Sequence, residues 1–121
     1  MSLSILAVDD SRTMRDMISL ALRDAGMTPH TADDGIHGLE VLDGLEPDAI
    51  ITDINMPRMD GFGFIDAVKS EPRTSQIPIL VLTTESADEL KARARAAGAT
   101  GWIVKPFDPA KLVRALRMVA G

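Results

Sequence analysis

Four short apolar segments constrain the fold of this chain more than any other feature of its sequence. They cover residues 5–8, 49–52, 79–82 and 101–104. Each is continuously apolar rather than alternating, which is typical of strands buried on both faces of a sheet. A weaker strand is predicted at residues 27–31, where Pro29 indicates a position at the edge of the sheet.

Amphipathic stretches separate these segments and predict five helices. The first has apolar residues at helical spacing, namely Met14, Met17, Ile18, Ala21, Leu22 and Ala25. The next three are predicted at residues 35–43, 62–69 and 87–97; the last of them has acids in its first turn and arginines toward its end, which suits the helix dipole. Asp108 as N-cap, followed by Pro109, predicts the start of the fifth.

The regular alternation of strand and helix predicts an α/β fold. Short connections and right-handed crossovers require a doubly wound, five-stranded parallel sheet with helices on both faces. The length of 121 residues is typical of one domain, so we expect a single domain over residues 1–121. Ligands of such sheets bind at the carboxyl ends of the strands, near the point where the strand order reverses.

Composition excludes several classes of function. The chain has no cysteine, so disulfides, thiolate zinc sites and cysteine nucleophiles are excluded. Its formal net charge of −5 argues against general nucleic-acid binding, which needs a basic face. The N-terminus lacks the basic segment of a signal peptide, and no apolar run approaches the length of a membrane span. We therefore expect a cytoplasmic protein that binds neither nucleic acid nor membrane.

Polar side chains follow four of the predicted strands, at the point where each strand ends. They are Asp9 and Asp10, Asp53, Thr83 with Thr84 and Glu85, and Lys105. Because the carboxyl ends of parallel strands meet at one edge of a sheet, we expect these side chains to converge. Three close carboxylates repel one another, and Mg²⁺ together with the ammonium group of Lys105 would balance them. A carboxylate in such surroundings can attack phosphorus and become an acyl phosphate.

Five stretches of the chain resemble, in order, the motifs of response-regulator receiver domains. They are Val8-Asp9-Asp10-Ser11, Thr52-Asp53-Ile54-Asn55-Met56-Pro57, Met59-Asp60-Gly61, Leu82-Thr83-Thr84-Glu85 and Val104-Lys105-Pro106-Phe107. The resemblance runs from the first strand to the last helix and is greatest to the CheY-type single-domain chemotaxis regulators. It implies a flavodoxin-like (βα)5 fold with strand order 2-1-3-4-5 and no output domain.

The resemblance also implies a role for each residue of the site. Asp53 would be the phosphoacceptor, with Lys105 and Thr83 contacting the phosphoryl group. Mg²⁺ would be bound by Asp10, Asp53 and the backbone carbonyl of Asn55, and by Asp9 through water. The bond between Lys105 and Pro106 would be cis, a minority state of X-Pro bonds.

Five residues concern the lifetime and the output of the signal. Asn55 and Glu85 stand where the family tunes dephosphorylation. Trp102 stands where most members have the Tyr or Phe that switches together with Thr83; a switch role and a purely core role are both open for it. Ala87 and Asp88 replace lysines that the family's motor binders carry, which leaves the docking contacts open.

The resemblance implies phosphorylation-dependent signalling in a two-component chemotaxis system. The donor would be a histidine kinase of the CheA type and the target the flagellar motor switch, with a phosphatase as a further partner and the chain as a monomer. It would catalyse its own phosphorylation and autodephosphorylation without acting on other substrates. A phosphate sink that drains the kinase without motor binding is the alternative. An aspartyl-phosphate phosphatase would need Asp-x-Asp after the first strand, and a flavin carrier would need a better phosphate loop than Ser11-Arg12-Thr13.

Overall fold

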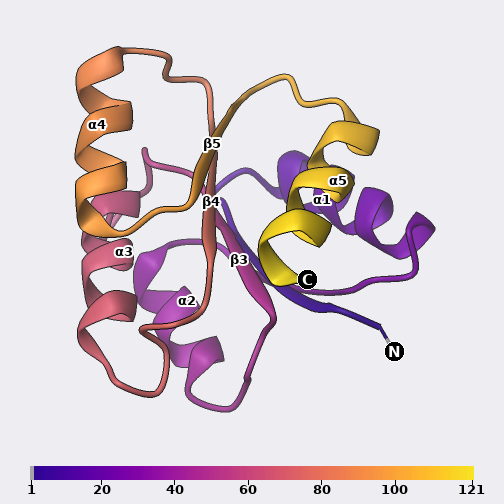
Figure 1. Cartoon of the computed structure of the whole chain (residues 1–121), viewed down its shortest axis with the longest axis horizontal. Coiled ribbons are helices and arrows are strands. Elements are labelled where there is room, and N and C mark those ends of the chain that lie inside the picture. The colour runs from indigo at the N-terminus through magenta and orange to yellow at the C-terminus, as the bar shows by residue number, and fades with distance from the viewer. Residues whose placement is uncertain (1) are drawn as a thin grey trace.

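The computed structural model, which describes residues 2–121, places a parallel sheet between two layers of helices (Figure 1). The strands lie in the order β2-β1-β3-β4-β5, all parallel, so the predicted doubly wound topology is confirmed. In chain order the elements are β1 Ser4–Val8, α1 Arg12–Asp24, β2 Thr28–Ala32, α2 Gly35–Leu42, β3 Ala49–Thr52, α3 Gly61–Ser70, β4 Ile79–Thr83, α4 Asp88–Ala97, β5 Gly101–Val104 and α5 Pro109–Ala120.

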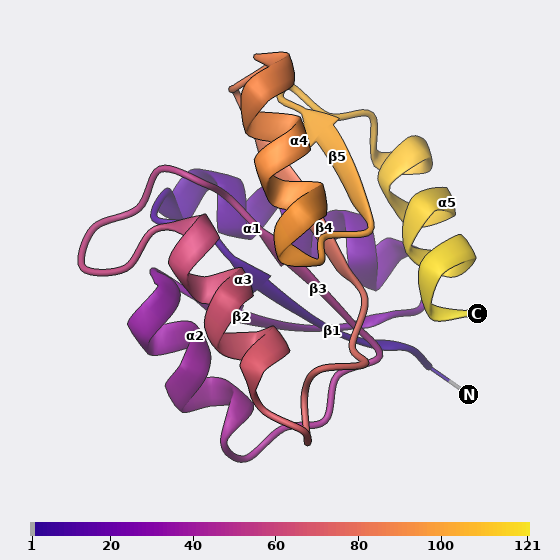
Figure 2. The same ribbon diagram turned by 60° about the vertical axis from the view of Figure 1, so that its left-hand side comes forward.

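Each face of the sheet has its own apolar core. Helices α1 and α5 cover one face, where Ile18, Leu22 and Leu112 pack on the strands. Helices α2, α3 and α4 cover the other, where Phe64 and Ile65 are fully buried (Figure 2). Strands β1, β3 and β4 therefore have helices on both sides, which explains why their sequences are continuously apolar.

The two edge strands differ from the central ones. β2 contains Pro29 and forms one edge, as predicted. β5 forms the other edge, and its residues are half-buried or exposed, with Val104 at 38% exposure. The expectation that residues 101–104 are buried on both faces is wrong, because an edge strand has a neighbour on one side only.

Helices α1, α2, α3 and α5 each begin where a polar side chain accepts from a free backbone N–H group, whereas α4, preceded by Ala87, has no such cap. Ser11 caps α1 by accepting from the backbone N–H of Met14 at 3.2 Å, and Asp108 caps α5 with Pro109 following, as predicted. Gly98 ends α4 in the left-handed conformation, with φ at 112°, which glycine adopts without strain. Met17 is 49% exposed and lies outside the apolar face of α1 to which the spacing assigned it.

Strand register brings the candidate residues to one edge of the sheet. Val8 of β1 is paired with Thr52 of β3, so Asp9 and Asp53 follow paired positions. The backbone N–H of Asp53 continues the ladder by donating to the carbonyl of Val8 at 2.9 Å.

Within residues 2–121, none of the helices combines the length and the apolar character that crossing a membrane requires.

Candidate functional site

Three carboxylates meet at the carboxyl end of the sheet. One oxygen from each of Asp9, Asp10 and Asp53 lies within 4.8 Å of the other two. Asp9 and Asp53 are buried, at 1% and 7% exposure, whereas Asp10 is exposed. The surrounding protein therefore shields two of the carboxylates from solvent, and the cluster is open to solvent at Asp10; we call this cluster the acidic pocket.

Lys105 joins the two buried carboxylates. Its ammonium nitrogen Nζ donates to Oδ2 of Asp9 at 2.7 Å and to Oδ2 of Asp53 at 2.8 Å. The lysine is placed by the sheet, because its backbone N–H donates to the carbonyl of Thr83 at 2.8 Å, just beyond the pairing of β4 with β5. The peptide bond between Lys105 and Pro106 is cis.

Backbone N–H groups hold the remaining oxygens of both buried carboxylates. Oδ1 of Asp9 accepts from the N–H of Ser11 at 2.9 Å, and Oδ1 of Asp53 accepts from the N–H of Ile54 at 2.6 Å. Each carboxylate thus has one oxygen hydrogen-bonded to a backbone N–H and the other to the ammonium group of Lys105. The orientation of both groups is fixed before any ligand arrives.

The electrostatics of the pocket follow from burial and from these hydrogen bonds. Burial raises the pKa of Asp9, and the hydrogen bonds from Lys105 and Ser11 offset this only in part. Burial alone would lower the pKa of Lys105, but its hydrogen bonds to Asp53 and Asp9 outweigh it, and the net shift is upward. The lysine is therefore held in its charged form, as a fixed cation beside Asp53.

The donor set fits a hard divalent cation. Every ligand atom of the cluster is a carboxylate oxygen, the ligand type that Mg²⁺ prefers. Three carboxylates and one ammonium group leave a formal excess of two negative charges in the pocket. A divalent cation would balance that charge, so the residues present are suited to one.

Thr83 and Glu85 stand at the end of β4, beside the carboxylates. Thr83 is fully buried, and its hydroxyl oxygen accepts from the N–H of Glu85 at 3.4 Å; within residues 2–121, no hydrogen bond joins it to Asp53. The Nδ2 amide of Asn55 donates to Oε1 of Glu85 at 3.0 Å. The two residues expected to tune dephosphorylation therefore contact each other, from the loops that follow β3 and β4.

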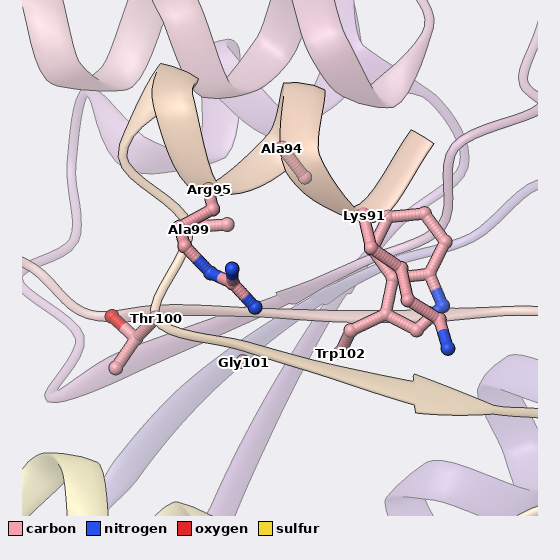
Figure 3. A pocket seen from close by; sticks show the side chains of 7 residues that line it. All are labelled: Lys91, Ala94, Arg95, Ala99, Thr100, Gly101 and Trp102. Atoms are coloured by element: carbon pink, nitrogen blue, oxygen red, sulfur yellow. The ribbon is translucent and has the colours of Figure 1, made fainter. Parts of the chain in front are cut away.

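Trp102 connects this region to the surface. Its indole N–H donates to the backbone carbonyl of Glu85 at 2.9 Å, which answers the need of a buried indole for a partner. The half-buried ring lines a cleft between α4 and β5, where Lys91 and Arg95 extend from α4 toward the strand (Figure 3). Trp102 thus packs against the core and also borders the surface, so the purely core role is wrong, and the switch role stays a prediction.

One contact of the pocket and one of the loop that follows β3 escaped the sequence analysis. The guanidinium of Arg15 donates to the backbone carbonyl of Asp9 at 2.7 Å, one turn into the helix that follows the acid pair. The short distance in sequence between Asp9 and Arg15 could have indicated this contact. The ion pair of Arg58 with Asp34, at 2.6 Å, joins the loop after β3 to the start of α2, and no periodicity or local spacing links residues 24 positions apart.

Comparisons with known proteins agree with this geometry. A family model described as "Response regulator receiver domain" matches residues 5–117. The "Probable chemotaxis protein CheY" of Rhizobium etli is 36% identical over 120 residues, which cover 98% of this chain and 93% of that protein. The solved structure of chemotaxis protein CheY4 of Vibrio cholerae has a TM-score of 0.94 and 45% identity, covering 98% of this chain and 99% of its own.

A more distant solved structure bears on the acidic pocket. It is the receiver domain of a sensor histidine kinase from Pseudomonas aeruginosa, with a TM-score of 0.91 and 26% identity, covering 100% of this chain and 99% of its own. A magnesium ion is coordinated in the active site cleft of that protein.

Proposed function

The chain belongs to the response regulator receiver domain family, and on that basis we propose that Asp53 accepts a phosphoryl group from a histidine kinase of the CheA type. The observation that carries the proposal is the contact of Lys105 with both Asp9 and Asp53, next to the exposed Asp10. A carboxylate between a fixed cation and a cluster of oxygen ligands is suited to attack on phosphorus.

Each residue of the pocket has a definite part in the proposed reaction. A carboxylate oxygen of Asp53 forms a bond to phosphorus while the bond from phosphorus to the donor histidine nitrogen breaks, and that nitrogen keeps the electron pair. Asp10, Asp53, the backbone carbonyl of Asn55 and Asp9 through water would hold Mg²⁺, which when bound supplies positive charge next to the phosphoryl oxygens. Lys105 supplies a second positive charge, already fixed in place.

We propose that autodephosphorylation uses the same group of residues. Hydrolysis requires water to reach phosphorus from the open side of the pocket. Asn55 and Glu85, hydrogen-bonded at 3.0 Å, lie on the loops that follow β3 and β4, at the same edge of the sheet as Asp53. Their side chains would therefore control the approach of water and the lifetime of the acyl phosphate.

We propose that the signal leaves the pocket through Thr83. A phosphoryl oxygen would draw the Thr83 hydroxyl away from its long hydrogen bond with Glu85. Because the carbonyl of Glu85 holds the Trp102 indole, a shift of this loop would change how the ring packs between α4 and β5. The face made by α4, β5 and α5 would then differ between the phosphorylated and unphosphorylated protein, and a protein partner would bind one of these forms more tightly.

Incubation with acetyl phosphate and Mg²⁺, followed by intact-mass measurement, tests the acceptor. Wild-type protein should gain one base-labile phosphoryl group, and Asp53→Asn should gain none. Asp60→Asn is a matched control, because Asp60 is an exposed carboxylate that caps α3 close by and Asn retains that cap. Equal labelling of wild type and Asp53→Asn would show that another group is the acceptor.

For the output, we propose contact with a flagellar motor switch protein, as the chemotaxis names of the relatives suggest. The cations Lys91 and Arg95 beside Trp102 would suit an acidic partner segment. A phosphate sink, which drains the kinase without motor binding, uses the same pocket. A pull-down of motor switch protein with and without beryllofluoride separates the two: binding strengthened by beryllofluoride supports the motor target, and no binding in either state supports the sink.

A further inference from the structure

The β3–α3 loop, residues 53–60, carries the carbonyl of Asn55. Its apolar side chains Ile54, Met56 and Met59 pack on the core, and its base is closed by the N–H of Gly61, which donates to the carbonyl of Ile54 at 2.8 Å. Its tip, at Pro57 and Arg58, is exposed. Contacts that the tip makes outside the loop therefore add to what fixes the position of the carbonyl.

The tip of the loop is held by an ion pair with two hydrogen bonds. Nε of Arg58 donates to Oδ2 of Asp34 at 2.6 Å, and Nη2 donates to Oδ1 at 2.8 Å. The next residue, Met59, accepts from the N–H of Gly35 through its carbonyl at 3.3 Å. A bidentate contact of this kind fixes direction as well as distance, which one hydrogen bond does not.

The other end of the ion pair is rigid. Asp34 is 4% exposed and caps α2, with its Oδ1 also accepting from the N–H of His37 at 2.8 Å. The Arg58 guanidinium lowers the pKa of Asp34, so the carboxylate is charged at neutral pH. Helix α2 packs so closely on α3 that a β-carbon on Gly38 would lie 2.8 Å from the Phe64 ring.

The backbone of Arg58 is unusual for its residue type. Its φ is 64°, in the left-handed region that residues other than glycine, asparagine and aspartate rarely adopt. Arginine is an unfavourable residue for that conformation. In this conformation its guanidinium makes both hydrogen bonds to Asp34, which compensate for the strain.

We infer that Arg58, held by Asp34, is a positioning residue that keeps the β3–α3 loop in the shape that binds the divalent cation. The inference rests on the proposed function, because it concerns the same acidic pocket. Arg58 touches neither the cation nor the phosphoryl group in this scheme. It acts by fixing the loop that also carries Asn55, whose side-chain amide donates to Glu85 at 3.0 Å.

Two single variants and their combination test this role. Arg58→Asn removes the guanidinium but tolerates the left-handed backbone, and Asp34→Asn removes the charge but retains the helix cap. Calorimetric titration with Mg²⁺ alone should show about tenfold weaker binding for each, as for other residues that support metal ligands indirectly. The double variant should lose little more than either single one, because both remove the same contact.

Arg73→Gln is the matched control. Arg73 also joins α2 to another segment, but at the far end of the helix, where it donates to the carbonyls of Leu42 at 2.5 Å and Leu45 at 3.3 Å. Its replacement should leave Mg²⁺ affinity unchanged. In metal-free protein, hydrogen exchange at the amide of Gly61 should be faster in Arg58→Asn than in wild type or Arg73→Gln.

The outcomes separate this inference from the proposed function. If Arg58→Asn binds Mg²⁺ as tightly as wild type, the positioning role is wrong, whatever its exchange rate, while phosphorylation of Asp53 stands. If Arg73→Gln loses affinity equally, the effect is general destabilisation and the inference fails. Wild-type protein that binds Mg²⁺ but takes no phosphoryl group contradicts the proposed function alone, and wild-type protein that binds no Mg²⁺ contradicts both.

Discussion

Replacement of Lys105 by methionine measures how strongly the acidic pocket depends on the ammonium group that joins its two buried carboxylates. Methionine keeps an unbranched apolar chain and removes the charge. In the metal-free protein this change leaves the buried carboxylates of Asp9 and Asp53 without their shared partner. We expect the variant to be markedly less stable than wild type at neutral pH.

The size of the effect follows from the two contacts. At an effective dielectric constant of about 20, unit charges at these separations, 2.7 and 2.8 Å, attract by about 6 kcal/mol each. Most of that attraction is offset by the desolvation of three largely buried groups, whose side chains are 10%, 2% and 10% exposed. Removal of one partner from a buried ion pair costs about 3–5 kcal/mol, so we expect a loss in that range.

Urea unfolding in EDTA, followed by the fluorescence of the only tryptophan, Trp102, measures this loss. Lys111→Met, an exposed lysine on α5, is the control and should change the free energy of unfolding by less than about 0.5 kcal/mol. Added Mg²⁺ should narrow the gap between Lys105→Met and wild type, because the cation replaces part of the missing charge. Equal stabilities of the two lysine variants in EDTA at pH 7 would refute the electrostatic account of the pocket.

The pH dependence of the same experiment has a definite sign. The pKa of Lys105 is raised in the folded protein, so its stabilising contribution is complete below 10.5, its ordinary value, and is lost as pH rises through the folded-state pKa. The pKa of Asp9 is also raised, so this carboxyl takes up a proton early as pH falls. The loss of stability caused by Lys105→Met should therefore be smaller in acid, because Asp9 is then protonated and no longer a buried charge without a partner.

Two other substitutions test separate features of the site. Asp9→Asn should stabilise the metal-free protein at neutral pH. The raised pKa of Asp9 means that its charged form destabilises the fold, increasingly so as pH rises above 3.8, the ordinary value. In urea unfolding below that pH the gain in stability should disappear. Gly61→Ala should destabilise the protein by about 3 kcal/mol, because the added β-carbon would collide with the carbonyl oxygen of Asp53. Gly44→Ala is the control and should have almost no effect on stability, because no atom lies within 4 Å of its β-carbon position. Similar unfolding curves for the two variants would contradict the close approach at Gly61.

The fold was predictable because its strongest signals are local. The continuous apolar runs at β1, β3 and β4 require cover on both faces, and their alternation with helices predicts a parallel sheet with right-handed crossovers. The strand order itself was implied by the resemblance to receiver domains. With β1 and β3 as neighbours, the meeting of Asp9 with Asp53 follows, because each residue comes directly after its strand. The sequence does not show in the same way that β5 is half-exposed, since its apolar content resembles that of a central strand.

Contacts between loops could not be predicted from the sequence. The need of Trp102 for a hydrogen-bond acceptor was predictable from its chemistry, but the acceptor is a backbone carbonyl, and any loop offers several. The left-handed conformation of Arg58 was also hidden, because the residue types that signal such a position are glycine and asparagine. In both cases the information lies in how elements distant in sequence pack together, and local patterns do not encode it.

Glu85 contacts Asn55 through its side chain and contacts Thr83 and Trp102 through its backbone. The side chain of Glu85 accepts from Asn55, whereas its backbone N–H donates to Thr83 and its carbonyl accepts from Trp102. A substitution at this position changes the first contact and leaves the two backbone contacts available. The lifetime of the acyl phosphate could therefore vary with the side chain at residue 85, while the connection from Thr83 to the α4–β5 cleft persists, because main-chain atoms make it.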